Sequence, residues 1–441
     1  MMKRTIGILL GSLIFAAASA AATDEAYYCD RSSVIGFQEF KSGRPNKVLP
    51  TLKEQMQSYR MASCDIPAKL SAAEAAKQAK WYKDAGFNMV LAEKCRTLIM
   101  DLLPASERSA VRRSIDDTIR DSRMFFDAAR KEGLQTMHHV TCTMVPMKLL
   151  QAHPEWAAVN LVTGKTEINT YGTGNTCVNN DEFWKLWFAR LERLLRESPC
   201  DSVMIDEIQF FSPQLCGCNS CRSKFKADTG YELPPNGKYK GWSTREPEAF
   251  RRWRKWRIEK LLERQDECRK LIKSLNTEMV FSAYLCNNLS GYTNYAFGYD
   301  VCNLPLYADS VGLESMPHGL RYPEYYPLVT LELKLLRAVA EQTGNAPWVL
   351  FYAQDSFSDM VSSLCAFATG TRQWWWLLGK KIMSGGRLPS GKWSMKLWSL
   401  PMKMPEISPC ISPLSTATTT LWDLWSGNWD FPESAMLLPI R

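Results

Sequence analysis

The sequence has no concentrated run of basic residues. Its 54 Lys and Arg are interspersed with 46 Asp and Glu, and the formal net charge is only +8. Proteins that bind nucleic acids gather basic side chains on one arm or face, where they neutralise phosphates. The composition therefore argues against a nucleic-acid partner, and we interpret the charge as that of an ordinary solvated surface.

Beyond its first residues the sequence also lacks any stretch of about 20 uninterrupted apolar residues, the length that a membrane-spanning helix needs. The start, "MMKRTIGILLGSLIFAAASAAATDEA", places Lys3 and Arg4 before an apolar run over residues 6–18, followed by small residues. That order is typical of a secretory signal peptide, which we assign to residues 1–22. We expect an exported protein, periplasmic or extracellular, with no membrane association after signal cleavage. An uncleaved anchor is the alternative.

The last part of the chain lacks sustained periodicity of either kind. Over residues 377–441, Pro, Ser, Trp and Met are interspersed, and no helix that would complete a repeat is visible. Two interpretations stay open for this segment. It is an irregular tail, or a reading-frame error or truncation has replaced the true C-terminus.

The rest of the chain consists of repeated helix and strand patterns. Four clear helical patterns occupy residues 72–85, 107–133, 181–199 and 247–276, each followed by an apolar strand pattern. The eight predicted strands are residues 33–37, 87–93, 134–141, 201–210, 278–285, 309–314, 347–354 and 371–376. Helical crossovers force parallel strands, and eight such units predict a closed (β/α)8 TIM barrel over residues 27–376. A doubly wound open sheet is the second choice.

Polar residues follow the predicted strands at their C-terminal ends. In a (β/α)8 barrel these ends form the mouth at which the active site lies. The residues concerned are Glu93, His139, Asp206, Glu207, Tyr284, Glu314, Tyr352 and Gln354. Their abundance of carboxylates suits acid–base chemistry on a polyol.

The carboxylates are the candidate catalytic groups. Hydrolysis of a glycosidic bond needs one carboxylic acid to protonate the leaving oxygen, and a second carboxylate that attacks the anomeric carbon or activates water. Successive strand residues point to opposite sides, so Asp206 and Glu207 both face the barrel only if the strand bends at its end. We therefore expect the catalytic pair among Asp206, Glu207 and Glu314.

The other strand-end residues are candidate substrate contacts. We assign Glu93, His139, Tyr284 and Tyr352 to this group. His138 and His139 are adjacent and so face opposite ways, which leaves one of them for the core. His139 is the predicted contact to a sugar hydroxyl.

Three cysteines form a C-x-C-x-x-C pattern nine residues after Glu207, at Cys216, Cys218 and Cys221. They could hold one tetrahedral ion, but a structural zinc site needs four ligands. Cys177 is our candidate for the fourth, with two competitors, Cys142 and Cys200. A disulfide within the cluster is the alternative in an exported protein. A second paired C-x-x-C, as in a zinc ribbon that binds nucleic acid, is absent.

With these residues in view, the sequence resembles the (β/α)8 glycoside hydrolases, and in its cysteine loop the family 42 β-galactosidases. In that family the acid/base glutamate ends the fourth strand, a C-x-C-x-x-C-x-x-x-F loop follows, and an earlier cysteine completes a zinc site. Here Glu207, "CGCNSCRSKF" from Cys216 to Phe225, and Cys177 in "CVNNDEF" match in order and spacing. The resemblance implies zinc bound by Cys177, Cys216, Cys218 and Cys221, and no cofactor for catalysis.

The chain departs from that family at the residue before the acid/base glutamate and at the position of the nucleophile. Asp206 stands where the family has Asn, and "PWVLFYAQDS" offers Tyr352 and Gln354 where the nucleophilic glutamate belongs. The sequence is also similar to hypothetical glycosyl hydrolases related to α-L-fucosidases, which place an aspartate nucleophile at the end of strand four. Two assignments stay open: Asp206 as nucleophile with Glu314 as acid/base, which we favour, or Glu207 as acid/base with Glu314 as its partner.

We therefore expect an exported glycoside hydrolase that cleaves an oligosaccharide or polysaccharide by a two-carboxylate mechanism. The alternative is a non-catalytic carbohydrate-binding or envelope protein that kept the barrel and lost its nucleophile. Tyr352, in the position of the expected glutamate, favours that alternative.

Overall fold

A computed structural model describes residues 59–64, 66–92, 98–104, 106, 114–168, 173–285, 296–300, 303–315, 326–351, 365–366 and 371–375. The predicted signal peptide, the predicted strand at residues 33–37 and the tail at residues 377–441 lie outside these residues. Among the helices that are described, none combines the length and the apolarity needed to cross a membrane.

The helices and strands alternate along the chain. The strands are β1 (Met61–Cys64), β2 (Met89–Ala92), β3 (Gln135–Thr141), β4 (Met144–Pro146), β5 (Thr173–Asn175), β6 (Ser202–Asp206), β7 (Val280–Leu285), β8 (Ser310–Ser315), β9 (Ala346–Phe351) and β10 (Arg372–Trp375). The α-helices are α3 (Ala72–Asp84), α4 (Ile115–Lys131), α5 (Met147–Ala152), α6 (Asp181–Glu197), α7 (Asn219–Thr229), α8 (Trp242–Arg245), α9 (Pro247–Leu275) and α11 (Tyr326–Thr343). Short 3-10 helices are η2 (Met100–Leu102), η4 (Pro154–Trp156) and η5 (Leu304–Leu306).

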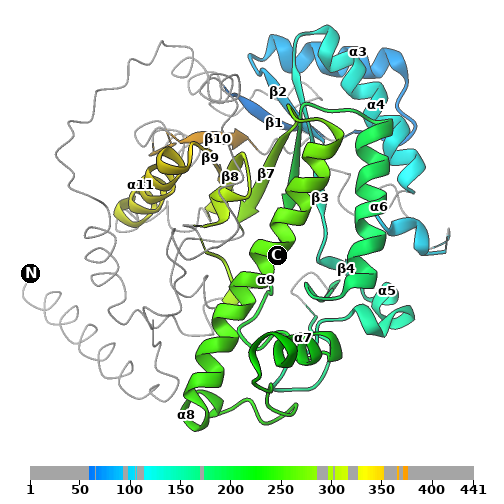
Figure 1. Cartoon of the computed structure of the whole chain (residues 1–441). Coiled ribbons are helices and arrows are strands. Elements are labelled where there is room, and N and C mark those ends of the chain that lie inside the picture. The colour runs from blue at the N-terminus through cyan, green and yellow to red at the C-terminus, as the bar shows by residue number, and fades with distance from the viewer. Residues whose placement is uncertain are drawn as a thin grey trace, which may run out of the picture.

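Eight parallel strands close into a barrel in the order β1-β10-β9-β8-β7-β6-β3-β2 (Figure 1). The predicted (β/α)8 barrel is confirmed, and the open-sheet alternative is wrong because β1 bonds to both β2 and β10. One strand assignment needs correction: the first barrel strand is Met61–Cys64, not residues 33–37. β4 and β5 form a separate antiparallel pair in the connection between β3 and α6.

Local sequence signals explain where the helices begin and end. Ser71 and Glu74 form a reciprocal capping box at the start of α3. The Asn180 side chain accepts the Phe183 N–H at 2.8 Å and caps α6. Gly133 follows α4 with φ +71°, a left-handed conformation that glycine adopts without steric cost. These signals determine where α3 and α6 begin and where α4 ends before β3.

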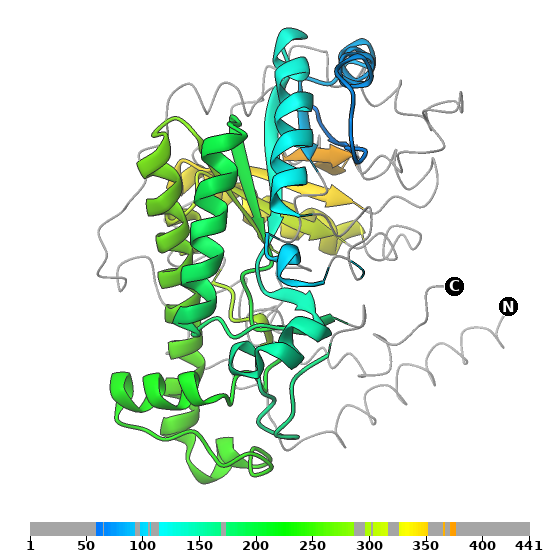
Figure 2. The ribbon, with the colours of Figure 1, turned by 90° about the vertical axis from the view of Figure 1, so that its right-hand side faces the viewer.

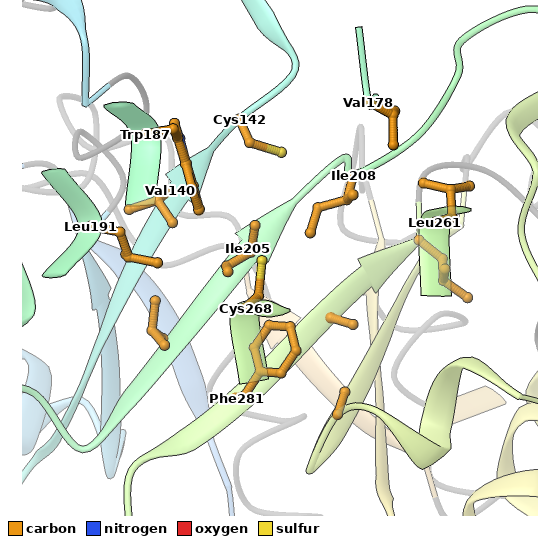
Figure 3. Close-up of a cluster of buried hydrophobic side chains, with 14 of the residues drawn as sticks. Val140, Cys142, Val178, Trp187, Leu191, Ile205, Ile208, Leu261, Cys268 and Phe281 are labelled. Carbon is orange, nitrogen blue, oxygen red and sulfur yellow. The ribbon is translucent and has the colours of Figure 1, made fainter. Parts of the chain in front are cut away.

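The helices α3, α4, α6 and α9 lie side by side around the outside of β1, β2, β3, β6 and β7 (Figures 1 and 2). Outward-pointing strand side chains pack against them. Figure 3 shows this layer, with Val140, Ile205 and Phe281 from the strands facing Trp187 of α6 and Cys268 of α9. This apolar layer anchors the strands that carry the candidate site.

The barrel interior holds a second apolar cluster. Its members alternate along the strands with the outward residues and are Tyr59, Met61, Met89, Leu91, Met137, Met204, Val280, Tyr284, Trp348 and Leu350. If the paired residues are traced from β2 through every strand and back to β2, the final partner lies eight residues from the starting residue. That offset is the shear of a (β/α)8 barrel, in which inward side chains from alternate strands share one layer.

Trp348 is the largest side chain in this interior cluster. Its indole stacks on Tyr284 with ring centroids 5.2 Å apart and donates Nε1–H to Ser282 Oγ at 2.9 Å. Gly312 on β8 leaves the room for the ring, because a Cβ at Gly312 would overlap the indole of Trp348. The inner layers are thus filled just below the ends of the strands.

We predict that Gly312→Ala lowers the free energy of unfolding by about 2 kcal/mol, because the added methyl overpacks the barrel interior. Urea unfolding of the variant measures the change. In a Trp348→Phe background the same substitution should cost clearly less, because the smaller ring frees the space. Equal costs in the two backgrounds would contradict this packing.

Candidate active site

Asp206 is the last residue of β6 and points into the barrel. The inward residue two positions earlier is Met204, and the intervening Ile205 lies in the outer layer (Figure 3). Asp206 is 8% exposed, although it is a carboxylate at a strand end. Such burial requires polar partners for the carboxylate.

His139 of β3 is the principal partner of Asp206. Its Nε2 lies 2.8 Å from Oδ2 of Asp206, and both side chains are buried. The other carboxylate oxygen, Oδ1, is also buried and has no hydrogen-bond partner among the described residues. The predicted contact of His139 with a sugar hydroxyl stays a prediction, and Asp206 is the residue that its Nε2 contacts in this structure.

Glu314 lies on β8 in the same layer as Asp206. Asp206 is in register with Tyr284, and Tyr284 with Gly312. Because of the shear, a residue at the same height along the barrel axis lies one position beyond the register partner for each strand crossed. Two strands from Asp206, the residue at its height is therefore two positions beyond Gly312, which is Glu314. Glu314 shares the inward orientation of Gly312 and is 6% exposed. Two buried carboxylates thus face the barrel interior from strands separated only by β7.

Glu207 follows at the point where the strand stops. Its φ is +58°, in the left-handed region that a non-glycine residue rarely occupies. The hydroxyl of Thr143 donates to the Glu207 carbonyl. The strand therefore bends at its end, and the alternation that would turn Glu207 outward no longer applies. Of the described non-glycine residues, only Lys69 and Phe211 share a positive φ with it.

Two predicted substrate contacts, Glu93 and Tyr352, lie outside the described residues. Tyr284 is described and lies in the layer beneath the carboxylates, stacked on Trp348. It therefore forms part of the apolar support under Asp206 and Glu314.

His138 points away from the barrel interior, as expected because the next residue along the strand, His139, points inward. It is fully buried, donates Nε2–H to the Ser198 carbonyl at 2.9 Å and packs against Phe126. Burial, with a smaller effect from Arg130, lowers the pKa of His138 to about 4. It is a neutral structural group.

This burial predicts an acid sensitivity. Because the folded pKa lies below the unfolded value of 6.5, the unfolded chain takes up a proton first as the pH falls. The stabilisation by neutral His138 is complete above about pH 6.5 and is lost as the pH falls toward 4. Between pH 7 and pH 4.5, the free energy of unfolding of the wild type should fall by about 2 kcal/mol more than that of His138→Gln. Parallel losses in urea titrations would contradict this.

The segment after Glu207 is fastened at several points. Phe210 N–H donates to the Phe297 carbonyl at 3.2 Å, which ties it to the connection after β7. Arg257 of α9 is fully buried and donates from one nitrogen to the Ser212 carbonyl at 2.9 Å and the Ala296 carbonyl at 2.7 Å. Its guanidinium also lies over the ring of Phe210. The residues beyond Asp206 are thus held by the connection after β7 and by α9.

The cysteine cluster ends this segment. The sulfurs of Cys177, Cys216, Cys218 and Cys221 all lie within 4.8 Å of one another, all four residues are buried, and none forms a disulfide. Cys177 precedes α6, whereas the others stand before and within the first turn of α7. Four such sulfurs could hold a metal ion, and this would pin the loop after Asp206 to the start of α6.

Polar hydrogens surround these sulfurs. Val159 N–H donates to Cys216 Sγ, and Asn179 donates from its backbone to Cys177 Sγ and from Nδ2 to Cys221 Sγ, each at 3.3 Å. Hydrogen bonds from neighbouring thiols, that of Cys177 foremost, hold the pKa of the Cys218 thiol far below its usual range. The hydrogen bond with Cys216 raises the pKa of the Cys177 thiol, and burial raises that of Cys221, so Cys218 is the thiolate of the metal-free cluster. Thiolate character and N–H···S contacts are what a metal-binding cluster requires.

The two competitors for the fourth ligand lie elsewhere. Cys142 belongs to the apolar layer of Figure 3, where its sulfur contacts the Asp206 carbonyl at 3.4 Å and burial raises the pKa of its thiol. Burial likewise raises the pKa of Cys200, to about 12. Both are core cysteines.

Two buried amides near the mouth were not singled out from the sequence. Asn175 of β5 is 1% exposed, and neither its Nδ2 nor its Oδ1 has a partner among the described residues. Gln209 accepts from the Tyr299 hydroxyl, but its Nε2 is buried without a partner in the same part of the chain. The one sequence feature that could have indicated either amide is that Gln209 lies three residues after Asp206.

Comparison with solved structures defines the class of this fold. The PgaB (BpsB) glycoside hydrolase domain from Bordetella bronchiseptica superposes with a TM-score of 0.57 at 13% identity, covering 78% of this chain and 99% of that domain. A β-galactosidase from Rahnella sp. R3 gives a TM-score of 0.57 at 14% identity over 78% of this chain and 56% of its own. An α-L-fucosidase from Paenibacillus thiaminolyticus gives 0.50 at 14% identity over 77% and 48%. The chain has the (β/α)8 fold of glycoside hydrolases.

No protein-family model and no curated protein sequence matches the chain. The chain spans nearly the whole PgaB domain but only a little over half of the β-galactosidase. At these identities the likeness concerns the fold, so any activity must be argued from the site itself.

Proposed function

We propose that this protein is an exported glycoside hydrolase that acts on an oligosaccharide or polysaccharide, with Asp206 as nucleophile and Glu314 as general acid/base. The observation that carries the proposal is the pair of buried carboxylates in one layer at the C-terminal ends of β6 and β8. This is the end of the barrel at which (β/α)8 enzymes hold their active sites.

The spacing of the two strands supports the pairing. With β7 between them, the backbones of β6 and β8 are about 10 Å apart. Side chains of Asp and Glu that both extend inward from such backbones are compatible with the separation of about 5 Å in retaining glycosidases. Asp206 is assigned the part of the nucleophile because His139 holds its carboxylate through Oδ2 at 2.8 Å.

The cysteine cluster is assigned a structural zinc ion within this proposal. Four thiolates suit tetrahedral zinc, and a closed site of this kind holds structure instead of performing chemistry. The ion would fix the loop after Asp206, because a mobile loop would not keep a carboxylate within catalytic tolerance.

The test is hydrolysis of a panel of aryl glycosides by the mature protein, including β-galactoside, α-L-fucoside and α-L-arabinoside. Asp206→Asn and Glu314→Gln variants are assayed beside it. Activity that disappears in either variant supports a two-carboxylate enzyme. A folded wild-type protein that hydrolyses none of them while still binding carbohydrate would favour the alternative, a carbohydrate-binding protein on a degenerate barrel.

A further inference from the structure

The two oxygens of the Asp206 carboxylate have different surroundings. Oδ2 lies 2.8 Å from Nε2 of His139, whereas Oδ1 is buried without a hydrogen-bond partner among the described residues. Leaving a buried carboxylate oxygen unpaired is costly, and native structures rarely do so without a functional reason. The asymmetry points to a reacting group that meets Oδ1 when substrate is bound.

His139 is built as a rigid support for this carboxylate. It lies within β3 and is 1% exposed, with the inward Met137 two residues before it and the outward Val140 after it. β3 and β6 are direct neighbours in the sheet, with Thr141 in register with Asp206. A side chain fixed by a central strand restrains its partner better than one on a loop does.

We propose that His139 is a positioning residue that holds Asp206 through Oδ2, so that Oδ1 is the oxygen that attacks the anomeric carbon. This inference rests on the proposed glycosidase function. For an ionised Asp206, Nε2 of His139 carries the proton and donates it in the hydrogen bond. The bond also prevents the carboxylate from rotating its two oxygens into each other's places.

The chemical step assigns each atom a place. A lone pair of Oδ1 forms a bond to the anomeric carbon while the bond from that carbon to the leaving oxygen breaks, and the leaving oxygen takes the proton of Glu314. Water then attacks the anomeric carbon, gives its proton to the Glu314 carboxylate and releases Asp206 as a carboxylate. His139 keeps its proton throughout.

The test combines kinetics with direct detection of the histidine. His139→Leu removes the donor, whereas His139→Gln places an amide N–H near the position of Nε2. The substrate is a dinitrophenyl glycoside, whose leaving group needs no protonation. The kcat/KM of the Leu variant should be about 100-fold below that of the wild type, and the kcat/KM of the Gln variant about tenfold above that of the Leu variant. The dissociation constant of a non-hydrolysable analogue should stay within a few fold. His138→Gln, at the adjacent buried histidine, should keep wild-type activity.

The second readout is the nitrogen NMR spectrum of histidine-labelled protein, which carries only four histidines. We expect the Nε2–H tautomer for His139 and a change of its Nε2 signal in Asp206→Asn. An active wild type with a fully active His139→Leu variant would overturn this inference while leaving the proposed function standing. Detection of the Nδ1–H tautomer would overturn it as well. A wild type inactive on every glycoside would refute the proposed function, and this inference with it.

Discussion

Replacing Asp206 with Asn should reduce the hydrolysis of every aryl glycoside by about 10⁴-fold or more, because the variant has no nucleophile to form the glycosyl intermediate. The substitution keeps the size of the side chain and can still accept a hydrogen bond from His139. Folding should therefore be preserved, and circular dichroism and urea unfolding would establish this. The loss should be the same for good and poor leaving groups.

Glu314→Gln provides the matched comparison. Loss of a general acid costs about 10² to 10⁴-fold, but only when the leaving group needs a proton. A dinitrophenyl glycoside should therefore undergo its first step almost normally in this variant, with a burst of dinitrophenolate. External azide should then restore turnover by replacing the activated water. If Glu314→Gln and Asp206→Asn respond alike to leaving group and azide, the two roles are wrongly assigned.

Replacing a cysteine of the cluster should have the largest effect on stability. We expect Cys218→Ser to lower the free energy of unfolding by about 3 kcal/mol or more, because the binding free energy of a structural zinc ion adds to folding. Chelation should lower the melting temperature of the wild type and have little effect on the variant. Elemental analysis should give one zinc per wild-type chain and much less in Cys218→Ser.

Cys200→Ala is the control for this experiment, since Cys200 is a buried thiol outside the cluster. It should keep its zinc and its response to chelator. A protein purified without metal, with a disulfide between two of the four cysteines found by mass spectrometry, would instead favour the disulfide expected of an exported protein.

The barrel could be predicted because its helices carry local signals that tertiary structure did not override. The capping box at Ser71 and the glycine after α4 mark helix ends in the sequence as clearly as in the structure. The first strand could not be predicted in the same way. Met61–Cys64 is only four residues long and contains no β-branched or aromatic residue, so strand propensity gives no signal there. The closure of the sheet defines it.

The candidate site was predictable in its members and not in its contacts. The ends of the predicted strands identified Asp206, Glu314 and His139 in the sequence. That Glu314 shares a layer with Asp206 depends on the register of three strands and on the shear, which no local pattern encodes. The hydrogen bond between His139 and Asp206 joins residues 67 positions apart for the same reason.

The cysteine cluster shows the same division. The C-x-C-x-x-C spacing places three sulfurs together by itself, because the chain between them is too short to separate them. Cys177 lies 44 residues before Cys221, and only the packing of α6 against α9 beside α7 brings its sulfur to 3.4 Å from that of Cys221. The sequence therefore predicts that cysteines a few positions apart lie together, but it does not determine which distant cysteine completes the cluster.

The measurement that tests the central claim most directly is labelling of the mature protein with a 2-deoxy-2-fluoro glycosyl fluoride of the sugar that the aryl glycoside panel identifies. The fluorine slows the second step, so a working nucleophile stays covalently glycosylated and can be located by peptide mass spectrometry. We predict one label per chain, on Asp206, and none in Asp206→Asn. A label on Glu207 or Glu314, or turnover with inversion of configuration and no label, would contradict Asp206 as the nucleophile.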